Sequence, residues 1–233
     1  METHQVAVVT GASRGLGAAF ARVLAQEGFA VALGARDVPG IERLAAELPV
    51  PTLAHPLDVG DAGSVRAFRD AVLGRFGRVD ALANNAGIGV FRRLDEISAE
   101  DFERTLRVNV LGAWAATVAF LPQLKAARGQ VFMISSDVST RTFPTGGAYT
   151  ASKFALRALA RTLQQENPEL RVLELRPGAV DTSFAGSTPG APGKEWFLRP
   201  ETVAEAIRFA LRLPPEARLE ELVIRSTGQT PEY

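Results

Sequence analysis

The sequence predicts an α/β fold with a doubly wound, seven-stranded parallel sheet and helices on both of its faces. Short, almost wholly apolar segments alternate with longer segments of helical pattern along the chain. Because the apolar segments lack period-two alternation, they are typical of strands buried on both faces, as in parallel sheets. The 233 residues, 46% of them hydrophobic, suffice for a single domain over 1–233 with a sizeable core.

The same pattern places each element in order. The predicted strands span 5–10, 30–35, 52–57, 79–83, 130–136, 170–175 and 221–226. The predicted helices span 18–27, 41–48, 61–76, 100–107, 109–124, 149–166 and 200–213. Residues 181–199 combine five Gly or Pro residues with three large aromatic residues. We expect a substrate lid there, with an ordinary surface loop as the alternative.

Composition excludes several classes of site and partner. The chain has no Cys and only two His, which excludes disulfides and thiolate chemistry and leaves no expected metal site. Because 26 basic residues balance 26 acidic ones, neither nucleic acid nor an anionic membrane is the expected partner. No apolar run reaches spanning length and no signal-peptide pattern opens the chain, so we expect a cytoplasmic protein.

A glycine-rich turn between the first predicted strand and helix indicates a nucleotide site. Gly11, Gly15 and Gly17 lie in this turn. Glycine allows a pyrophosphate to approach the backbone, and the positive end of the helix dipole favours its charge. On its own the motif is weak, and an ordinary tight turn is the alternative.

Arg36 follows the second predicted strand, where a protein distinguishes NADP from NAD. A guanidinium there suits the 2′-phosphate of NADP, and Arg14 in the glycine turn could supply a second one. Asp37 is one residue late for the acid that would bind the ribose of NAD. We therefore expect NADP as the preferred cofactor, with NAD as the alternative. If both arginines only face solvent, they indicate neither cofactor.

Polar residues also follow other predicted strands at their carboxyl ends, where open parallel sheets bind ligands. Asp58 follows the third strand, the Asn-Asn-Ala-Gly stretch 84–87 the fourth, Ser136 ends the fifth, and 176–178 follow the sixth. The convergence of these residues on one edge is more informative than any single motif.

Tyr149 and Lys153 are the residues best suited to catalysis. They are four residues apart in a predicted helix, so their side chains would share one face. An ammonium beside a phenol favours the phenolate and lowers its pKa from about 10, which would let Tyr149 exchange a proton near neutral pH. A surface polar pair is the alternative, but the chain has only two Tyr.

Taken together, the motifs resemble those of the short-chain dehydrogenase/reductase family. The matching stretches are TGASRGLG (10–17), Asp58, NNAG (84–87), Asn109, Ser136, YTASK (149–153) and RPGAVDT (176–182). The resemblance implies a Rossmann-like, NADP(H)-dependent oxidoreductase that interconverts a small ketone or aldehyde and an alcohol. It also implies a homodimer or homotetramer formed through 109–127 and 149–166.

The resemblance assigns roles to individual residues. Tyr149 would act as acid and base, Ser136 would stabilise the substrate oxygen, and Lys153 would bind the nicotinamide ribose and lower the pKa of Tyr149. Asn109 would take part in a proton relay, with a helix N-cap as its alternative role. The implied cofactor-binding residues are Thr10, Gly11, Ser13, Arg14, Gly15, Leu16, Gly17, Arg36, Asp58, Val59, Asn84, Ala86, Gly87, Tyr149, Lys153, Pro177, Gly178, Val180 and Thr182.

Three alternatives stay open. Asn84 could brace the end of its strand as well as contact the cofactor ribose. Asp137 departs from the family pattern, which has small residues after the serine; we expect it to face solvent, and a place in the pocket would favour polar or cationic substrates. The chain could also be an NAD-linked dehydrogenase, or a non-catalytic NADP(H)-binding regulator on the same fold.

Overall fold

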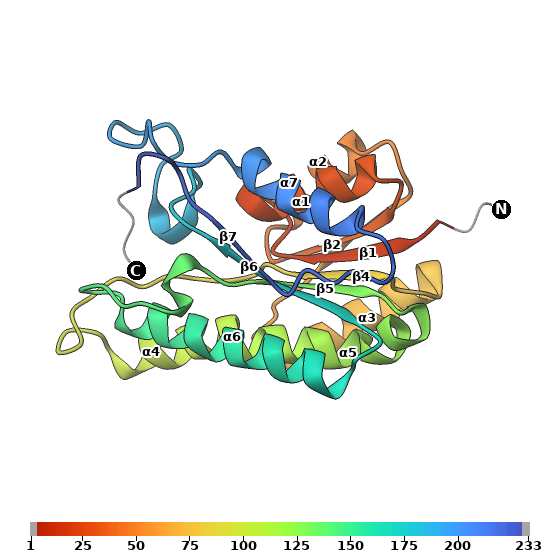
Figure 1. Ribbon diagram of the computed structural model, residues 1–233, viewed down its shortest axis with the longest axis horizontal. Helices are drawn as coiled ribbons and strands as arrows, with labels where there is room; N and C mark the ends of the chain where they lie inside the picture. Colours follow the sequence, from red (N-terminus) through yellow and green to blue (C-terminus); the bar gives the residue numbers. More distant parts are fainter. Residues whose placement is uncertain (1–3, 230–233) are drawn as a thin grey trace.

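A computed structural model describes residues 4–229, which form a seven-stranded parallel sheet between two layers of helices (Figure 1). The strand order is β3-β2-β1-β4-β5-β6-β7, and each neighbouring pair runs parallel. The chain starts in the middle of the sheet, winds outward to β3, and returns to β4 to wind the other way. The predicted doubly wound fold is thereby confirmed.

The strands and helices lie close to their predicted positions. The strands are β1 (Val6–Thr10), β2 (Ala30–Ala35), β3 (Thr52–Pro56), β4 (Ala81–Asn84), β5 (Gln130–Ile134), β6 (Arg171–Pro177) and β7 (Glu221–Ile224). The α-helices are α1 (Gly15–Gln26), α2 (Val38–Glu47), α3 (Ala62–Phe76), α4 (Ala99–Leu106), α5 (Gly112–Ala127), α6 (Gly147–Glu166) and α7 (Pro200–Leu211). A π-helical turn, η1 (Arg107–Leu111), and two 3₁₀ turns, η2 (Asp137–Ser139) and η3 (Phe184–Gly186), complete the described elements.

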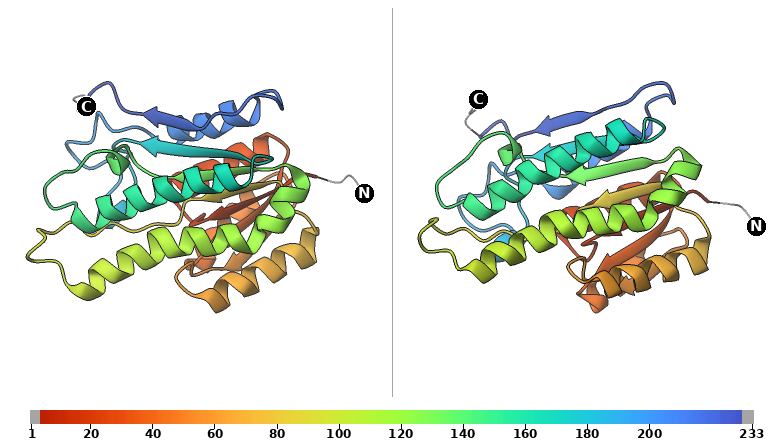
Figure 2. Two further views of the ribbon diagram at one scale, coloured as in Figure 1. Left: turned by 60° about the horizontal axis from the view of Figure 1, so that its bottom comes forward. Right: turned by 90° about the horizontal axis from the view of Figure 1, so that it is seen from below.

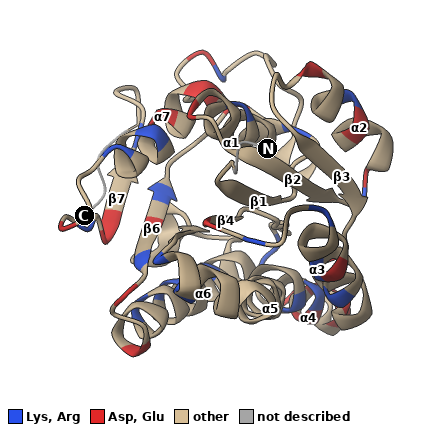
Figure 3. Cartoon of the chain, turned by 90° about the vertical axis from the view of Figure 1, so that its right-hand side faces the viewer, with Lys and Arg blue, Asp and Glu red and all other residues tan. Residues whose placement is uncertain are grey.

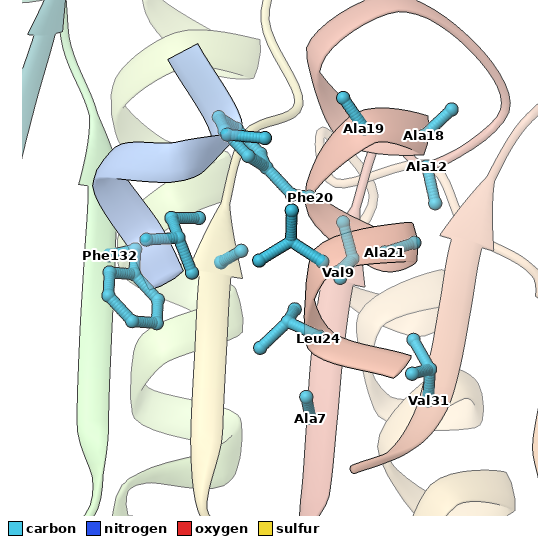
Figure 4. Packing of buried hydrophobic residues seen from close by; sticks show 14 of the residues in the cluster. Ala7, Val9, Ala12, Ala18, Ala19, Phe20, Ala21, Leu24, Val31 and Phe132 are labelled. Carbon is cyan, nitrogen blue, oxygen red and sulfur yellow. The ribbon is translucent and has the colours of Figure 1, made fainter. Parts of the chain in front are cut away.

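Helices α1, α2 and α7 cover one face of the sheet, and α3 to α6 cover the other (Figures 1 and 2). On the first face, Phe20 and Leu24 of α1 form one apolar cluster with Val9, Val31 and Phe132 of the sheet (Figure 4). Each of these five side chains is almost fully buried, and such burial stabilises a fold by about 1.5–3 kcal/mol per large apolar side chain. This packing fixes the sheet whose carboxyl ends carry the polar residues.

Helix α2 begins three residues earlier than the sequence predicts. The carboxylate of Asp37 accepts a hydrogen bond from the Gly40 N–H at 3.1 Å and so caps the helix. Pro39 lies in the first turn, where its missing N–H costs nothing. The predicted start at Ile41 overlooked this cap.

The two helices predicted over 100–107 and 109–124 are parts of one continuous helix from Ala99 to Ala127. The π-helical turn η1 joins them, so Asn109 lies inside the helix and the alternative that it is an N-cap is wrong. This helix is long and apolar enough to span a membrane by length and composition, contrary to the expectation from the sequence. Its inner face, including Phe120 and Leu124, packs in the core under the sheet, and 33% of its most apolar stretch is buried.

Candidate active site

A cleft with a volume of about 990 Å³ runs along the carboxyl ends of the central strands. Most of the predicted site residues line it: Gly11, Ser13, Arg14, Gly15, Leu16, Arg36, Asp58, Val59, Ala86, Gly87, Ser136, Tyr149, Lys153, Pro177, Gly178, Val180 and Thr182. The other four, Thr10, Gly17, Asn84 and Asn109, lie behind its wall. The sheet edge therefore brings together residues that are up to 171 positions apart in the sequence, from Gly11 to Thr182.

The glycine turn needs glycine for two separate reasons. Gly11 and Gly15 have φ values of +66° and +56°, in the left-handed region that other residues disfavour. At Gly17 a Cβ atom would run into the carbonyl oxygen of Gly11. Arg14 is the N-cap of α1 and makes no side-chain capping bond, so the first N–H groups of the helix are left for an anion.

Thr10 and Asn85 join the glycine turn to the end of β4. The Thr10 hydroxyl accepts hydrogen bonds from the N–H groups of Asn85 and Ala86, both at 3.0 Å. The Asn85 amide donates to the carbonyl oxygens of Thr10 and Gly11 at 3.0 and 3.1 Å. Thr10 thus shapes the cleft from behind, and Asn85, which lines the cleft, is a site residue that sequence reasoning missed.

Asn84 turns away from the cleft. Its amide donates to the Thr117 hydroxyl at 2.8 Å and to the Met133 sulfur at 3.3 Å, and its side chain is buried between β4 and α5. The structure therefore does not bring Asn84 together with the other predicted cofactor residues. Its contacts support the role of a brace at the end of the strand, and contact with the cofactor ribose stays a prediction.

Arg14 and Arg36 are exposed at the edge of the cleft near the ends of β1 and β2. Asp37 also lines this part of the cleft, but its carboxylate is occupied in capping α2. Among the described residues, neither arginine forms an ion pair. This corner of the cleft therefore presents two available cations to a ligand.

Ser136, Tyr149 and Lys153 meet at the opposite wall, where Ser136 follows β5 and caps the turn η2 while the other two lie on α6. Helix α6 begins at Gly147, which puts Tyr149 in its first turn and Lys153 one turn later. The Lys153 ammonium lies 5.6 Å from the centre of the Tyr149 ring and donates to the carbonyl of Ile134 at 2.8 Å. The Ser136 hydroxyl donates to the carboxylate of the neighbouring Asp137 at 3.3 Å.

Burial controls the protonation of this group of residues. It raises the pKa of Tyr149 to about 12, although the hydrogen bond with Ser136 acts in the opposite direction and the charge of Asp137 adds to the rise. It lowers the pKa of Lys153 to about 8, against the attraction of the Glu174 carboxylate. The expectation that Lys153 lowers the pKa of Tyr149 is thus not met here, because loss of solvation around the phenol outweighs other effects.

Asn109 connects the helix under the sheet to α6. Its side-chain oxygen accepts from the Ile88 N–H at 2.8 Å, and its amide donates to the Ile88 carbonyl at 2.9 Å. The amide also donates to the Ser152 hydroxyl at 2.9 Å, which in turn donates to the Tyr149 carbonyl at 2.6 Å. Asn109 therefore holds the backbone of α6 from one side.

Aromatic rings surround Tyr149 on the side that opens to solvent. Phe91 lies edge-on to the Tyr149 ring at 5.5 Å between ring centres, and Phe184 lies at 5.6 Å. Phe143 contacts Phe91 in turn, at 5.8 Å. No motif marks Phe91 or Phe143; Phe184 belongs to the segment 181–199 that the sequence singled out for its aromatic residues.

Asp137 points neither to solvent nor into the cleft, so both expectations for it are wrong. It is only 4% exposed and is ion-paired with Arg141 and Arg225 at 2.7 and 3.2 Å. Two cations thus neutralise one buried carboxylate. Arg141 is four residues away, whereas Arg225 is 88 residues away and no local pattern indicates it.

Comparison with known proteins agrees with this geometry. A family model described as short chain dehydrogenase matches residues 5–191. The fold is similar to that of an alcohol dehydrogenase from Thermococcus sibiricus, solved in complex with 5-hydroxy-NADP. That structure is 51% identical with a TM-score of 0.95, and the match covers 99% of this chain and 100% of the other.

Two further proteins show the breadth of the similarity. The 3-ketoacyl-(acyl-carrier-protein) reductase from Brucella melitensis, solved with NADH, is 29% identical with a TM-score of 0.87, and the match covers 96% of this chain and 97% of the other. Glycine betaine reductase ATRR of Emericella nidulans is 36% identical over 94% of this chain, but the chain spans only 18% of that protein.

Proposed function

Because the chain belongs to the short-chain dehydrogenase family, we propose that it is an NADP(H)-dependent oxidoreductase that interconverts a ketone or aldehyde and an alcohol. One observation carries the proposal. Ser136, Tyr149 and Lys153 face the same cleft that the glycine turn opens, so an acid–base group and a nucleotide cradle share one space. A binding protein would have no use for the phenol.

The residues at the cleft fit a dinucleotide. Gly11 and Gly15 line the floor without side chains, and the uncapped start of α1 offers N–H groups to a pyrophosphate. Arg14 and Arg36 would hold a 2′-phosphate, which supports NADP, as does the neighbour solved with a 5-hydroxy-NADP. The neighbour solved with NADH leaves NAD as the alternative cofactor. When bound, the nicotinamide supplies or accepts the hydride.

Tyr149 would give its proton to the substrate oxygen. Since burial raises its pKa to about 12, it is a neutral phenol at neutral pH and holds the proton that reduction needs. Ser136 would donate a hydrogen bond to the same oxygen as negative charge develops on it. After the transfer, the phenolate would be stabilised by the Lys153 ammonium 5.6 Å from its ring centre.

Lys153 and Asn109 would support this step from behind. The carbonyl of Ile134 fixes the Lys153 ammonium at the wall of the cleft, within reach of a cofactor ribose. Asn109 would hold α6 through Ser152 and lie at the inner end of a proton relay. Its placement inside η1, with its amide bonded to α6, supports the first of these roles directly.

We propose that residues 181–199 form a lid over the substrate. Thr182 and Phe184 line the cleft, and Phe184 covers one side of Tyr149. Thr182 also lies against Gly15, so this segment reaches across to the nucleotide turn. A surface loop with no role would not make both contacts.

The outer faces of α5 and α6 support self-association as a homodimer or homotetramer. Leu111, Trp114 and Val118 on one long helix, and Phe154 on its neighbour, are each more than 40% exposed. Such exposed apolar faces mark interaction surfaces. The molecular mass in solution tests this proposal, and a cytoplasmic location stays a prediction.

Two assays on the purified chain test the proposed function. We expect tight binding of NADPH, followed by its oxidation with at least one member of a panel of ketones and aldehydes. Tight NADPH binding with no turnover across the panel would favour the alternative of a non-catalytic regulator. Equal affinities for NADPH and NADH would favour the NAD-linked alternative.

A further inference from the structure

Buried charge gathers beneath the loop that carries Ser136. Five charged side chains are buried among the described residues: Asp80, Asp137, Lys153, Glu174 and Arg176. All except Asp80 lie near the carboxyl end of β5 or on β6 (Figure 3 shows charged positions within β6). The mechanism above uses only Lys153, so the other charges near the site need a reason, because burying a charge costs free energy unless it is paired.

Asp137 is held by three segments at once. One oxygen of its carboxylate accepts from Arg141 at 2.7 Å, from Arg225 at 3.2 Å and from the Gln229 amide at 2.9 Å. Arg141 belongs to the loop after the serine, and Arg225 and Gln229 follow β7. The carboxylate therefore ties the start of the serine loop to the end of the chain that the structure describes.

Arg176 of β6 holds the backbone of the same loop. Its guanidinium donates to the carbonyl oxygens of Ser136 at 3.4 Å and of Asp137 at 3.3 Å. It also donates to the Thr140 hydroxyl and to the carboxylate of Glu221 on β7. Two consecutive peptide groups, beginning with that of Ser136, are thus fixed by one rigid, buried group.

Gln229 extends the connection to the cofactor side of the cleft. Its side-chain oxygen accepts from the Ala179 N–H at 3.3 Å, while its amide donates to Asp137. Ala179 lies in the segment between Gly178 and Val180, both of which line the cleft. At Gly178 a Cβ atom would run into the Gln229 side chain, so these two segments are in close contact. A single side chain therefore spans the serine loop and the cofactor loop.

We propose that Asp137 and Arg176 are positioning residues that hold Ser136 against the substrate oxygen, with Gln229 linking them to the cofactor loop. The inference rests on the proposed function, in which Ser136 has to be aligned with the substrate oxygen. Asp137 accepts a hydrogen bond directly from the Ser136 hydroxyl at 3.3 Å, on the carboxylate oxygen that the two arginines leave free, and Arg176 holds the backbone of the loop. Neither residue lines the cleft, so both would act through Ser136. Preorganised donors are effective only when their geometry is fixed, and a small misplacement can cost a large factor in rate.

A double-mutant cycle between Asp137 and Ser136 tests the proposal. Asp137→Asn keeps the shape of the side chain but removes its charge, and we expect kcat to fall about 10-fold to 100-fold while KM for NADPH stays within about twofold. In a Ser136→Ala background the same substitution is expected to change kcat by less than about twofold, because the group it positions is gone. Independent, multiplicative losses would show a general structural role and overturn the proposal.

Asp80→Asn is the matched control. Asp80 is equally buried and is ion-paired with Arg78 at 2.6 Å, at the opposite end of the sheet. We expect it to lower the melting temperature and leave kcat unchanged. Gln229→Ala, on an exposed turn, is the second variant if Asp137→Asn fails to fold, and we expect a smaller fall in kcat that also disappears in the Ser136→Ala background.

The outcomes separate this inference from the function it rests on. If Ser136→Ala itself retains full activity, the proposed function is wrong. If Ser136→Ala loses activity while Asp137→Asn and Gln229→Ala do not, the function stands and the positioning role is overturned.

Discussion

The two walls of the cleft are built in opposite ways. At the β1–β2 wall, glycines and backbone groups shape the site, and its charges, Arg14 and Arg36, are exposed. At the β5–β6 wall, buried side chains carry the charge, and Glu221 of β7 forms an ion pair with Arg176 of β6. Figure 3 shows the charged positions on these two strands. A bound anion needs space and N–H groups, whereas proton transfer needs donors fixed in direction. Cofactor binding at the β1–β2 wall should therefore be most sensitive to changes in shape. Proton transfer at the β5–β6 wall should be most sensitive to changes in charge.

Among the changes that alter cofactor binding, the largest effect is expected from Gly17→Ala. The added methyl group would overlap the carbonyl oxygen of Gly11, and the neighbouring Asn85 amide leaves no room for the helix to shift. We expect the affinity for NADPH to fall more than about 100-fold, since the turn can no longer approach a pyrophosphate. Calorimetric titration with NADPH measures this directly.

Gly74→Ala in α3 is its control, because a Cβ atom there meets nothing within 4 Å and the residue has no positive φ. Alanine is favoured over glycine in a helix by about 1 kcal/mol, so stability should rise and NADPH affinity should not change. Equal NADPH affinity in the Gly17→Ala variant would show that shape does not govern this wall.

An intermediate effect is expected from Arg36→Asp. Removing a charge-assisted hydrogen bond of about 1.5–3 kcal/mol should weaken NADPH binding roughly 10-fold to 100-fold. Binding of NADH, which lacks the 2′-phosphate, should change little. Dissociation constants for both cofactors measure the difference, with Arg43→Asp on the exposed side of α2 as the control. A parallel loss for both cofactors would contradict the assigned role of Arg36.

The smallest change is expected in the pH profile. Lys153 has its pKa lowered to about 8, so it is an ammonium below that pH and an amine above it. We expect kcat/KM for reduction to be level below pH 8 and to fall up to about tenfold per pH unit above it. Lys153→Arg stays charged, so its profile should remain level to higher pH. A profile of the parent that is flat through pH 9.5 would contradict this assignment.

Titration of Lys153 also changes the stability of the fold, and stability responds to pH in the opposite direction from activity. Because the folded state lowers the pKa of Lys153 from 10.5 to about 8, the unfolded chain binds the proton more tightly between these values. The contribution of Lys153 to stability therefore increases as the pH rises through this window, while activity falls. Keeping the Lys153 ammonium buried therefore lowers the stability of the fold, as expected for a group that serves a function.

The contrast between the walls also explains how much the sequence could predict. The positions of the strands and helices, the glycine turn and the Tyr149–Lys153 pair follow from local patterns, because strand periodicity, turn chemistry and helical spacing act within about twenty residues. Open parallel sheets bind ligands at the carboxyl ends of their strands, and this rule predicted that the matched stretches lie in one cleft. These predictions concern backbone placement.

Side-chain direction was harder to predict. Asn84 and Asn85 are neighbours on a strand end and so point in opposite directions, and only the structure shows which of them reaches the cleft. The ion pair between Asp137 and Arg225 joins residues 88 positions apart, with no local pattern to reveal it. The pKa of Tyr149 depends on enclosure by Phe91 and Phe184, which come from unrelated loops.

The central claim is that Tyr149 supplies the proton in a cleft whose nucleotide site is built independently of it. Tyr149→Phe removes one oxygen atom and keeps the ring that packs against Phe91 and Phe184. The most direct measurement is the single-turnover rate of NADPH oxidation by this variant with a saturating carbonyl substrate, alongside its NADPH dissociation constant. We expect the rate to fall about 10²-fold to 10⁴-fold with the affinity unchanged. A variant that keeps the parent's rate would contradict the account.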